Sequence, residues 1–143
     1  MKCTTIIDNE RKEVLIYTDK ITNETKAIEC FVLGLETEIQ AYKNKETILL
    51  SQNEVYCFTS ENGSIYAITE NEKLLVKQRI FQLEELLSDN FVKINQSSLA
   101  NITKIKRFDA SFGGSLLVIF KNGYRDYVSR RQTKAVKERI GIK

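Results

Sequence analysis

Between residues 47 and 128 the sequence is divided into short runs of apolar and β-branched residues, each bounded by turn-forming residues. Runs of this length, separated by clusters such as SQNE, SENG and ENE, indicate strands rather than helices. The expected strands cover residues 47–50, 55–59, 64–69, 74–77, 91–94, 102–108, 116–120 and 124–128. The pattern predicts a mainly β domain with peripheral helices, an α+β fold.

Two further strands are expected near the N-terminus, at residues 4–7 and 13–17, ahead of the first helix. The polar residues 42–46 indicate a turn or a boundary. We therefore divide the chain into an N-terminal β/α segment, residues 1–40, and a second domain, residues 41–143.

Three helical segments are expected. The first begins at about Asn23, with Thr22 or Asn23 as N-cap, and its apolar residues fall at helical spacing: Ala27, Ile28, Phe31, Val32, Leu35 and Ile39. The second covers residues 80–87, and its apolar side comprises Ile80, Leu83, Leu86 and Leu87. The third begins at Ser129, which can form a capping box with Gln132, and its buried stripe comprises Ala135, Val136 and Ile140.

Two shorter features are expected within the strand-rich part of the chain. Residues 97–100 fit a single helical turn. The pair Asn122-Gly123, between two strand-like runs, predicts a tight hairpin turn of type I′.

The residue types exclude several kinds of chemistry. The chain has no histidine, which removes histidine acid–base catalysis, Ser-His and Cys-His pairs, and metal sites that need imidazole. Cys3, Cys30 and Cys57 form no CxxC pair, so a reduced cytoplasmic protein with buried thiols is expected. No apolar run near the N-terminus fits a secretory signal, and no stretch of 18 apolar residues is present.

Charge is unevenly distributed along the chain. Residues 1–90 carry 10 Lys and Arg against 16 Asp and Glu, a net charge of −6. Residues 91–143 carry 12 Lys and Arg against 3 acidic residues, a net charge of +9. Such asymmetry suggests a polyanionic partner for the basic part. A basic face that pairs with the acidic part of the same molecule would give the same counts, so charge alone leaves both readings open.

Three ordered motifs carry a family resemblance. They are FVKINQSSLANI at residues 91–102, FKNG at 120–123 and VSRR at 128–131, preceded by the LEELL helix and the hairpin of residues 55–66. The sequence resembles the LytTR DNA-binding domain of bacterial transcriptional regulators over roughly residues 40–142. The resemblance implies an elongated, mostly β fold whose loops enter successive major grooves of double-stranded DNA. It also implies paired repeat sites occupied by a homodimer.

The resemblance further implies which positions face DNA: the hairpin loop, the loop after residue 94 and the start of the last helix. On this basis Asn62, Ser64, Asn95, Gln96, Arg130 and Arg131 are expected to bind DNA. The full set of DNA-binding residues expected from the sequence adds Ser97 and four basic residues, Lys93, Lys104, Lys121 and Lys134. Asn101 matches an asparagine of the family and is expected to be structural. Asn95, Gln96, Ser115 and Gln132 depart from residues common in the family, which affects the preferred DNA sequence rather than the fold.

Two arginines break a local rule of helix stability. Arg130 and Arg131 are expected in the first turn of a helix, where a cation costs about 0.3–1 kcal/mol. A phosphate there would meet free backbone N–H groups and two guanidinium groups, and either arginine could instead read guanine O6 and N7. The alternative is that both arginines pair with acids such as Asp126 or Glu138.

The loop residues and the lysines also allow two readings. Asn95 and Gln96 can read adenine, or they can cap the short turn near Ser97. Phosphate contacts are expected from a set of basic residues: Lys93, Lys104, Lys106, Arg107, Lys121, Lys134 and Lys137.

About forty residues precede the DNA-binding domain, too few for a doubly wound receiver, so Asp8 and Asp19 are not expected to be phosphorylation sites. The chain thus resembles the short, receiver-less LytTR proteins. The apolar stripe from Ile28 to Ile39 suggests that residues 1–40 form a surface for self-association or for a partner. Family analogy alone adds a small membrane protein as a possible regulator.

Two other functional classes were weighed against a DNA-binding regulator. The basic part could bind RNA or an acidic protein, but the aromatic residues fall at strand-core positions rather than on an open stacking face. An enzyme lacks a Gly-rich phosphate loop and a metal cluster, and Glu84, Glu85 and Asp109 fit a solvated surface better than acid catalysis. The sequence therefore favours a non-enzymatic transcriptional regulator without cofactor or small-molecule substrate.

Overall fold

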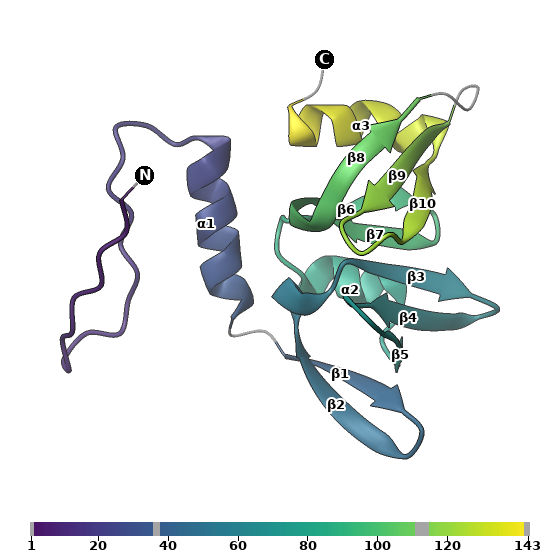
Figure 1. Cartoon of the computed structure of the whole chain (residues 1–143), viewed down its shortest axis with the longest axis horizontal. Helices are drawn as coiled ribbons and strands as arrows, with labels where there is room; N and C mark the ends of the chain where they lie inside the picture. Colours follow the sequence, from purple (N-terminus) through teal and green to yellow (C-terminus); the bar gives the residue numbers. More distant parts are fainter. Residues whose placement is uncertain (1, 36–37, 111–114, 142–143) are drawn as a thin grey trace.

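The computed structural model describes residues 2–35, 38–110 and 115–141 of the chain. Within these residues the chain forms a seven-stranded sheet, a three-stranded sheet and three α-helices (Figure 1). Every strand pair is antiparallel. The expectation of a mainly β, α+β fold with peripheral helices is confirmed.

The strand order is β2-β1-β5-β4-β3-β7-β6 in the larger sheet and β10-β9-β8 in the smaller one. The larger sheet contains β1 (Glu38–Lys43), β2 (Glu46–Ser51), β3 (Cys57–Glu61), β4 (Ser64–Ile68), β5 (Lys73–Val76), β6 (Phe91–Asn95) and β7 (Ser98–Asn101). The smaller sheet contains β8 (Ile105–Asp109), β9 (Leu116–Phe120) and β10 (Arg125–Val128). The helices are α1 (Asn23–Gly34), α2 (Ile80–Leu86) and α3 (Arg130–Ile140), with the 3₁₀ turns η1 (Gln52–Glu54) and η2 (Ile102–Lys104).

The larger sheet is packed on both faces, because successive side chains of a strand point to opposite sides. On one face Phe58 of β3 packs in a cluster with Leu83 of α2. On the other face Cys57 packs in a cluster with Val118 of β9 and Val136 of α3. The fold therefore has three layers: α2, the larger sheet, and the smaller sheet with α3.

Most of the expected strands form close to their expected limits. Six are confirmed with ends that shift by no more than one residue: 47–50, 64–69, 74–77, 91–94, 116–120 and 124–128. The strand expected at residues 55–59 begins two residues later, at Cys57. The strand expected at 102–108 begins with the η2 turn and becomes extended only at Ile105.

The helical turn expected at residues 97–100 is wrong. Residues Ser98–Asn101 form strand β7, which pairs with β6 on one side and β3 on the other. All four residues of this strand are buried. Pairing with two neighbouring strands outweighs the local preference of a short polar sequence for a turn.

The two Asn-Gly pairs of the chain differ in geometry. At Asn122-Gly123 only Gly123 has a positive φ, +90°, whereas a type I′ turn needs positive φ at both positions. The expected type I′ turn is therefore wrong there, although the hairpin between β9 and β10 forms. Positive φ at both positions occurs instead at Asn62 (50°) and Gly63 (80°), between β3 and β4.

The N-terminal part differs most from expectation. The strands expected at residues 4–7 and 13–17 do not form, and residues 2–21 contain no helix or strand. Helix α1 begins at Asn23 with Thr22 as its N-cap, as expected. It ends at Gly34, so Ile39, expected on its apolar stripe, lies buried in β1 instead.

Strand β1 also bears on the division of the chain. Residues 42–46 contain the turn between β1 and β2, as expected, but the strand before that turn was not anticipated. The expected boundary after residue 40 falls inside β1. Since β1 pairs with both β2 and β5, we place the start of the sheet domain at Glu38.

The start of α3 lacks its expected capping box. Ser129 is the N-cap residue, but its side chain makes no capping bond. Its backbone N–H donates to Ile94 O at 2.9 Å, so the side chain of Gln132 finds no free N-cap amide. The N–H of Gln132 instead donates to the backbone oxygen of Ser129.

Several side chains expected to be buried lie at the surface. Ala135 of α3 and Leu86 of α2 are exposed, because each helix buries a narrow face centred on Val136 and Leu83. Among the cysteines Cys57 is buried, Cys30 is half-buried and Cys3 is exposed, so the expectation of buried thiols holds for Cys57 alone.

Candidate nucleic-acid interface

Three short segments that are far apart in the sequence form one edge of the molecule, on the right in Figure 1. They are the β3–β4 turn (residues 62–64), the β6–β7 turn (95–97) and the first turn of α3 (130–134). Backbone bonds join them: Ser60 N donates to Ser97 O at 2.8 Å, and Ser129 N to Ile94 O at 2.9 Å. We call this surface, residues 62–64, 95–97 and 130–134, the loop edge.

Asn95 holds the loop edge together from inside. It is only 3% exposed, and its Nδ2 donates to Tyr127 O at 2.8 Å and to Asp126 Oδ1 at 3.1 Å. Its Oδ1 accepts from Ser97 N at 2.9 Å. The bond to Ser97 N closes the β6–β7 turn instead of capping a helical turn, and the buried Asn95 side chain bonds within the protein through both its Nδ2 and its Oδ1. Gln96, the next residue, is exposed.

Asp126 of β10 is the second residue that fixes this edge. Its Oδ2 accepts from Ser98 Oγ at 2.6 Å, and Ser98 Oγ also lies 3.1 Å from Thr59 Oγ1. The backbone N–H of Tyr127 donates to Asp126 Oδ1 at 2.8 Å. The carboxylate thereby connects β10 to β7 and β3. Sequence reasoning considered Asp126 only as an ion-pair partner and missed this role.

The first turn of α3 presents uncompensated positive charge. Arg130, Arg131 and Lys134 are exposed. Within the described residues, none of these three side chains lies within 4.0 Å of a carboxylate, so pairing with Asp126 or Glu138 is not observed. Backbone N–H groups without helical partners and the positive end of the helix dipole lie at the same place. This combination suits an anion such as a phosphate.

An open groove of about 620 Å³ runs beside the loop edge, between the β3–β4 hairpin, the β6–β7 turn and α2. Its polar lining comes from Ser64, Gln96 and Ser97 of the loop edge. Its basic lining comes from Lys77, Arg79 and Lys93. The groove, which the acidic Glu84 also lines, therefore adds basic side chains between the loop edge and α2.

Two of these basic residues were not predicted. Lys77 and Arg79 belong to the acidic part of the sequence. The net charge of −6 over residues 1–90 gave no sign of these two basic residues. The available signal was their position just before α2, with no acid between them. Lys93, which was predicted, is half-buried with its Nζ 3.8 Å from Glu84 Oε1.

Lys104 and Lys121 lie away from the loop edge. Lys121 N donates to Lys104 O at 2.9 Å beside the β9–β10 turn, and β10 runs from this turn toward α3. Lys121 Nζ donates to Thr103 O at 2.9 Å, and Lys104 Nζ lies 5.2 Å from the centre of the Tyr56 ring. The other expected phosphate contacts are on β8 and in the middle of α3: Lys106, Arg107 and Lys137.

Asn101 is structural, as expected. It is buried, and its Nδ2 donates to Val55 O at 2.9 Å. Its Oδ1 accepts from Thr103 N at 3.1 Å and from Thr103 Oγ1 at 2.7 Å. The side chain therefore fixes the path from β7 into η2.

The described residues contain no group of three or more Cys, Asp or Glu side chains that could hold a metal ion. The same residues include no helix with the length and apolar character needed to cross a membrane.

Comparison with known families gives one match to most of the chain. The family model of the LytTr DNA-binding domain matches residues 45–141. The matched range contains all three segments of the loop edge, whereas residues 2–35 lie outside it.

Relatives that align over most of this chain come from Staphylococcus aureus. One, from strain MSSA476, is named an uncharacterized HTH-type transcriptional regulator; it is 28% identical, and the alignment covers 99% of each chain. Another of the same name, from strain NCTC 8325, is 29% identical over 89% of this chain and 88% of its own. In the present chain strands separate the helices, so the described residues contain no helix-turn-helix pair.

A solved structure shares the fold. It is the LytTr DNA-binding domain of a response regulator from Bacillus cereus, with a TM-score of 0.71 and 19% sequence identity. The similarity covers 75% of this chain and 99% of that one. The whole of that domain therefore has a counterpart here, and about a quarter of the present chain does not.

Proposed function

The chain belongs to the LytTr DNA-binding domain family, and from this premise we propose that it regulates transcription by placing the loop edge in the major groove of double-stranded DNA. The family is one of regulators rather than enzymes, and the proposal assigns no reaction to the chain. Its ligand, chromosomal DNA, would place it in the bacterial cytoplasm.

The proposed division of labour follows the exposure of each side chain. Gln96, Asn62 and Ser64 are at least partly exposed at the two turns, where amide and hydroxyl groups can bond to base edges. Arg130 and Arg131 would contact phosphate or a guanine edge from the start of α3. Asn95 acts indirectly, through the shape of the turn.

Basic residues around the loop edge would supply sequence-independent affinity. Lys93 and Lys134 were expected in this role, and the groove adds Lys77 and Arg79. Each phosphate neutralised by a cation releases counterions, which makes binding depend steeply on salt. Lys104 and Lys121 lie apart, and the proposal leaves them outside the base-reading surface.

The observation that carries the proposal is the exposed pair Arg130 and Arg131 at the positive end of α3, without carboxylate partners among the described residues and beside the exposed Gln96. Cations at a helix N-terminus are unfavourable in the free protein, and an anion bound there would offset this cost. We further propose that two copies bind paired repeats, since one loop edge reads one short site.

The test is a salt titration of binding to duplex DNA, duplex RNA and heparin, after the preferred duplex has been selected from a random pool. The proposal predicts enrichment of one sequence and tighter binding to it than to random DNA, RNA or heparin at every salt concentration. Equal affinity for all four ligands would contradict it. Tighter binding to RNA would favour the alternative of an RNA-binding module.

A further inference from the structure

Residues 2–21 form an extended segment that lies apart from both sheets, beyond α1 (Figure 1). Its hydrogen bonds are local: Glu10 N donates to Asp8 Oδ1, and Thr18 and Lys20 bond to each other. No backbone–backbone bond joins this segment to any other described residue. Its peptide groups are therefore available to another strand.

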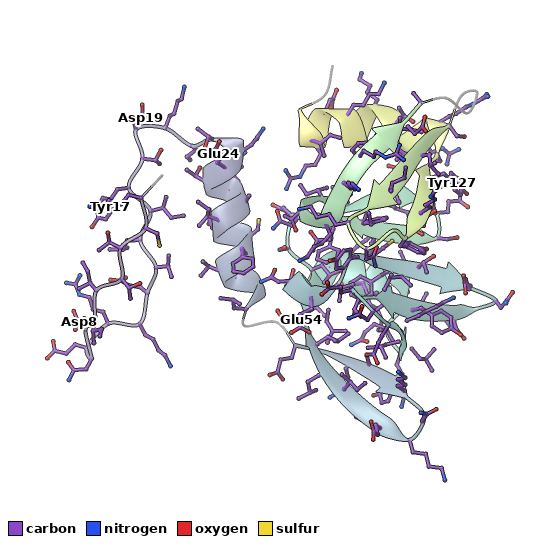
Figure 2. The ribbon with its side chains drawn as sticks, in the orientation of Figure 1. Asp8, Tyr17, Asp19, Glu24, Glu54 and Tyr127 are labelled. Carbon is purple, nitrogen blue, oxygen red and sulfur yellow. The ribbon has the colours of Figure 1, made fainter. Side chains whose placement is uncertain are left out.

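The same segment exposes a set of large apolar side chains: Ile6, Ile7, Val14, Leu15, Ile16, Tyr17 and Ile21. Many are β-branched or aromatic, the residue types that favour strands. Figure 2 shows Tyr17 on the side of the segment that points away from α1. Side chains of this kind, exposed together along one stretch, mark an interaction surface rather than ordinary protein surface.

Helix α1 is attached to the sheet domain through its C-terminal end. Asn53 Nδ2 donates to Phe31 O at 2.9 Å, and Ser51 Oγ donates to Gly34 O at 3.2 Å. A Cβ atom on Gly34 would lie 2.6 Å from Asn53 Oδ1, so a larger residue there would require the Asn53 side chain to move. Three large side chains near this end are exposed: Phe31, Leu33 and Leu35.

We propose that residues 2–35 bind the same residues of a second copy, so that the extended segments pair as strands and the α1 helices cover them. One copy supplies two strand-length runs, residues 4–7 and 13–17, and one helix. A two-stranded hairpin is at best marginally stable in water, and a sheet without other support needs three or more strands with an apolar face. Two copies supply four strands and two helices, which meets that requirement.

Charge favours a second copy at this surface. Residues 2–35 carry 5 basic and 6 acidic residues, a net charge of −1, so two copies do not repel each other there. Residues 91–143 carry a net charge of +9, which opposes contact between two loop edges. An interface that pairs identical segments is also the usual arrangement of a symmetric dimer.

The location agrees with the proposed function, on which this inference rests for the use of paired repeats. The extended segment and the loop edge are on opposite sides of the molecule, as the positions of Tyr17 and Tyr127 in Figure 2 show. Dimerisation through residues 2–35 therefore leaves both loop edges open to DNA. The family match begins at residue 45, so this segment is additional to the DNA-binding fold.

The experiment compares two matched variants of the full chain, Leu15→Asp and Leu49→Asp. Leu15 is 57% exposed in the extended segment, and Leu49 is 58% exposed on the edge strand β2. Light scattering after size exclusion should give about twice the chain mass of 16.5 kDa for the wild type and for Leu49→Asp. Leu15→Asp should give the single-chain mass.

Hydrogen exchange of the same samples identifies the contact. Amides of residues 4–7 and 13–17 should be protected in the wild type and in Leu49→Asp, and should exchange freely in Leu15→Asp. A wild-type chain that stays at 16.5 kDa at the highest attainable concentration overturns the inference. So does a dimer in which these amides are unprotected, or one that Leu49→Asp disrupts as strongly as Leu15→Asp does.

Binding to a duplex with a single site separates this inference from the proposed function. Leu15→Asp should bind one site with wild-type affinity and lose only the added affinity for paired sites. If no variant binds DNA, the proposed function fails whatever the mass. If the wild type binds DNA as a monomer without protected N-terminal amides, only the dimer inference fails.

Discussion

The loop edge and the N-terminal segment are both exposed, but they are held in different ways. The loop edge consists of tight turns whose backbone is fixed by buried groups, chiefly Asn95 and Asp126. Residues 2–21 have no such bonds, and they expose large apolar side chains among charged ones. A surface held by buried bonds is preformed before its ligand binds. An unpaired extended segment, in contrast, forms a strand only when it pairs with a partner.

The contrast explains why this small protein carries two kinds of surface. Reading a base sequence requires side chains held in a fixed geometry, and two packed cores behind the turns provide it. Association with another protein chain does not need a preformed surface, because strands can form when the partner arrives.

The largest expected difference between the two regions is in stability. Phe58 is fully buried, with its ring centre 5.6 Å from that of Phe91, and Phe58→Ala should lower the free energy of unfolding by about 3–5 kcal/mol. Ile7 is exposed, and Ile7→Ala should change the free energy of unfolding by less than about 0.5 kcal/mol at dilutions that keep the chain monomeric. Denaturant titration measures both; similar losses would show that residues 2–21 pack on the domain.

A smaller effect should come from the buried polar network behind the loop edge. Asp126→Ala removes the acceptor of Ser98 Oγ and one acceptor of Asn95 Nδ2, and should cost about 1.5–3 kcal/mol. It should also weaken binding to the selected duplex, because the β6–β7 turn loses its anchor. Asp89→Ala, at an exposed acid, is the control. Equal stability and equal DNA affinity of the two variants would contradict the role given to Asp126.

The smallest expected effect is a pH dependence of the free energy of unfolding, to which the buried Cys57 contributes and the exposed Cys3 does not. Burial, and then the negative charge of Asp126, raise the pKa of the Cys57 thiol well above its ordinary value of 9.0. The folded thiol thus stays neutral at pH values where the unfolded thiol ionises. Its contribution to stability is full below pH 9.0 and is lost as pH rises further.

Between pH 8 and 10 this linkage should lower the free energy of unfolding by roughly 1 kcal/mol. The loss should be smaller in Cys57→Ala and unchanged in Cys3→Ala, because Cys3 is exposed. Denaturant titrations at several pH values provide the measurement. An identical slope in Cys57→Ala would show that the buried thiol is not its source. Tyr124, whose pKa burial also raises, affects stability with the same sign only near and above its ordinary value of 10.0.

The sequence predicted the β-rich class and most strand positions because apolar runs and turn residues are local signals. It failed where pairing decides the outcome. Residues 98–101 look like a turn but form a strand between two neighbours, and residues 4–7 and 13–17 look like strands but have no neighbour within the chain. Strand propensity shows that a segment is able to form a strand, and tertiary contacts decide whether the strand forms.

The candidate site shows the same limit. Motif resemblance nominated the three segments of the loop edge, and the fold brings them together. Spacing along the chain could not reveal that Asn95 points inward while Gln96 is exposed, because this depends on bonds to Asp126 and Tyr127 from a distant strand. Nor could it place Lys104 and Lys121 beside the far end of β10.

The most direct test of the account compares two arginines at opposite ends of α3. Arg131 lies in the first turn, and Arg139 lies in the last turn, where its Nη2 donates to Asp89 O. Arg131→Ala should weaken binding to the selected duplex by about 1–3 kcal/mol, with a smaller loss on random DNA, whereas Arg139→Ala should keep wild-type affinity. If Arg131→Ala binds the selected duplex like the wild type, or if Arg139→Ala weakens it as much, the loop edge is not the surface that reads DNA.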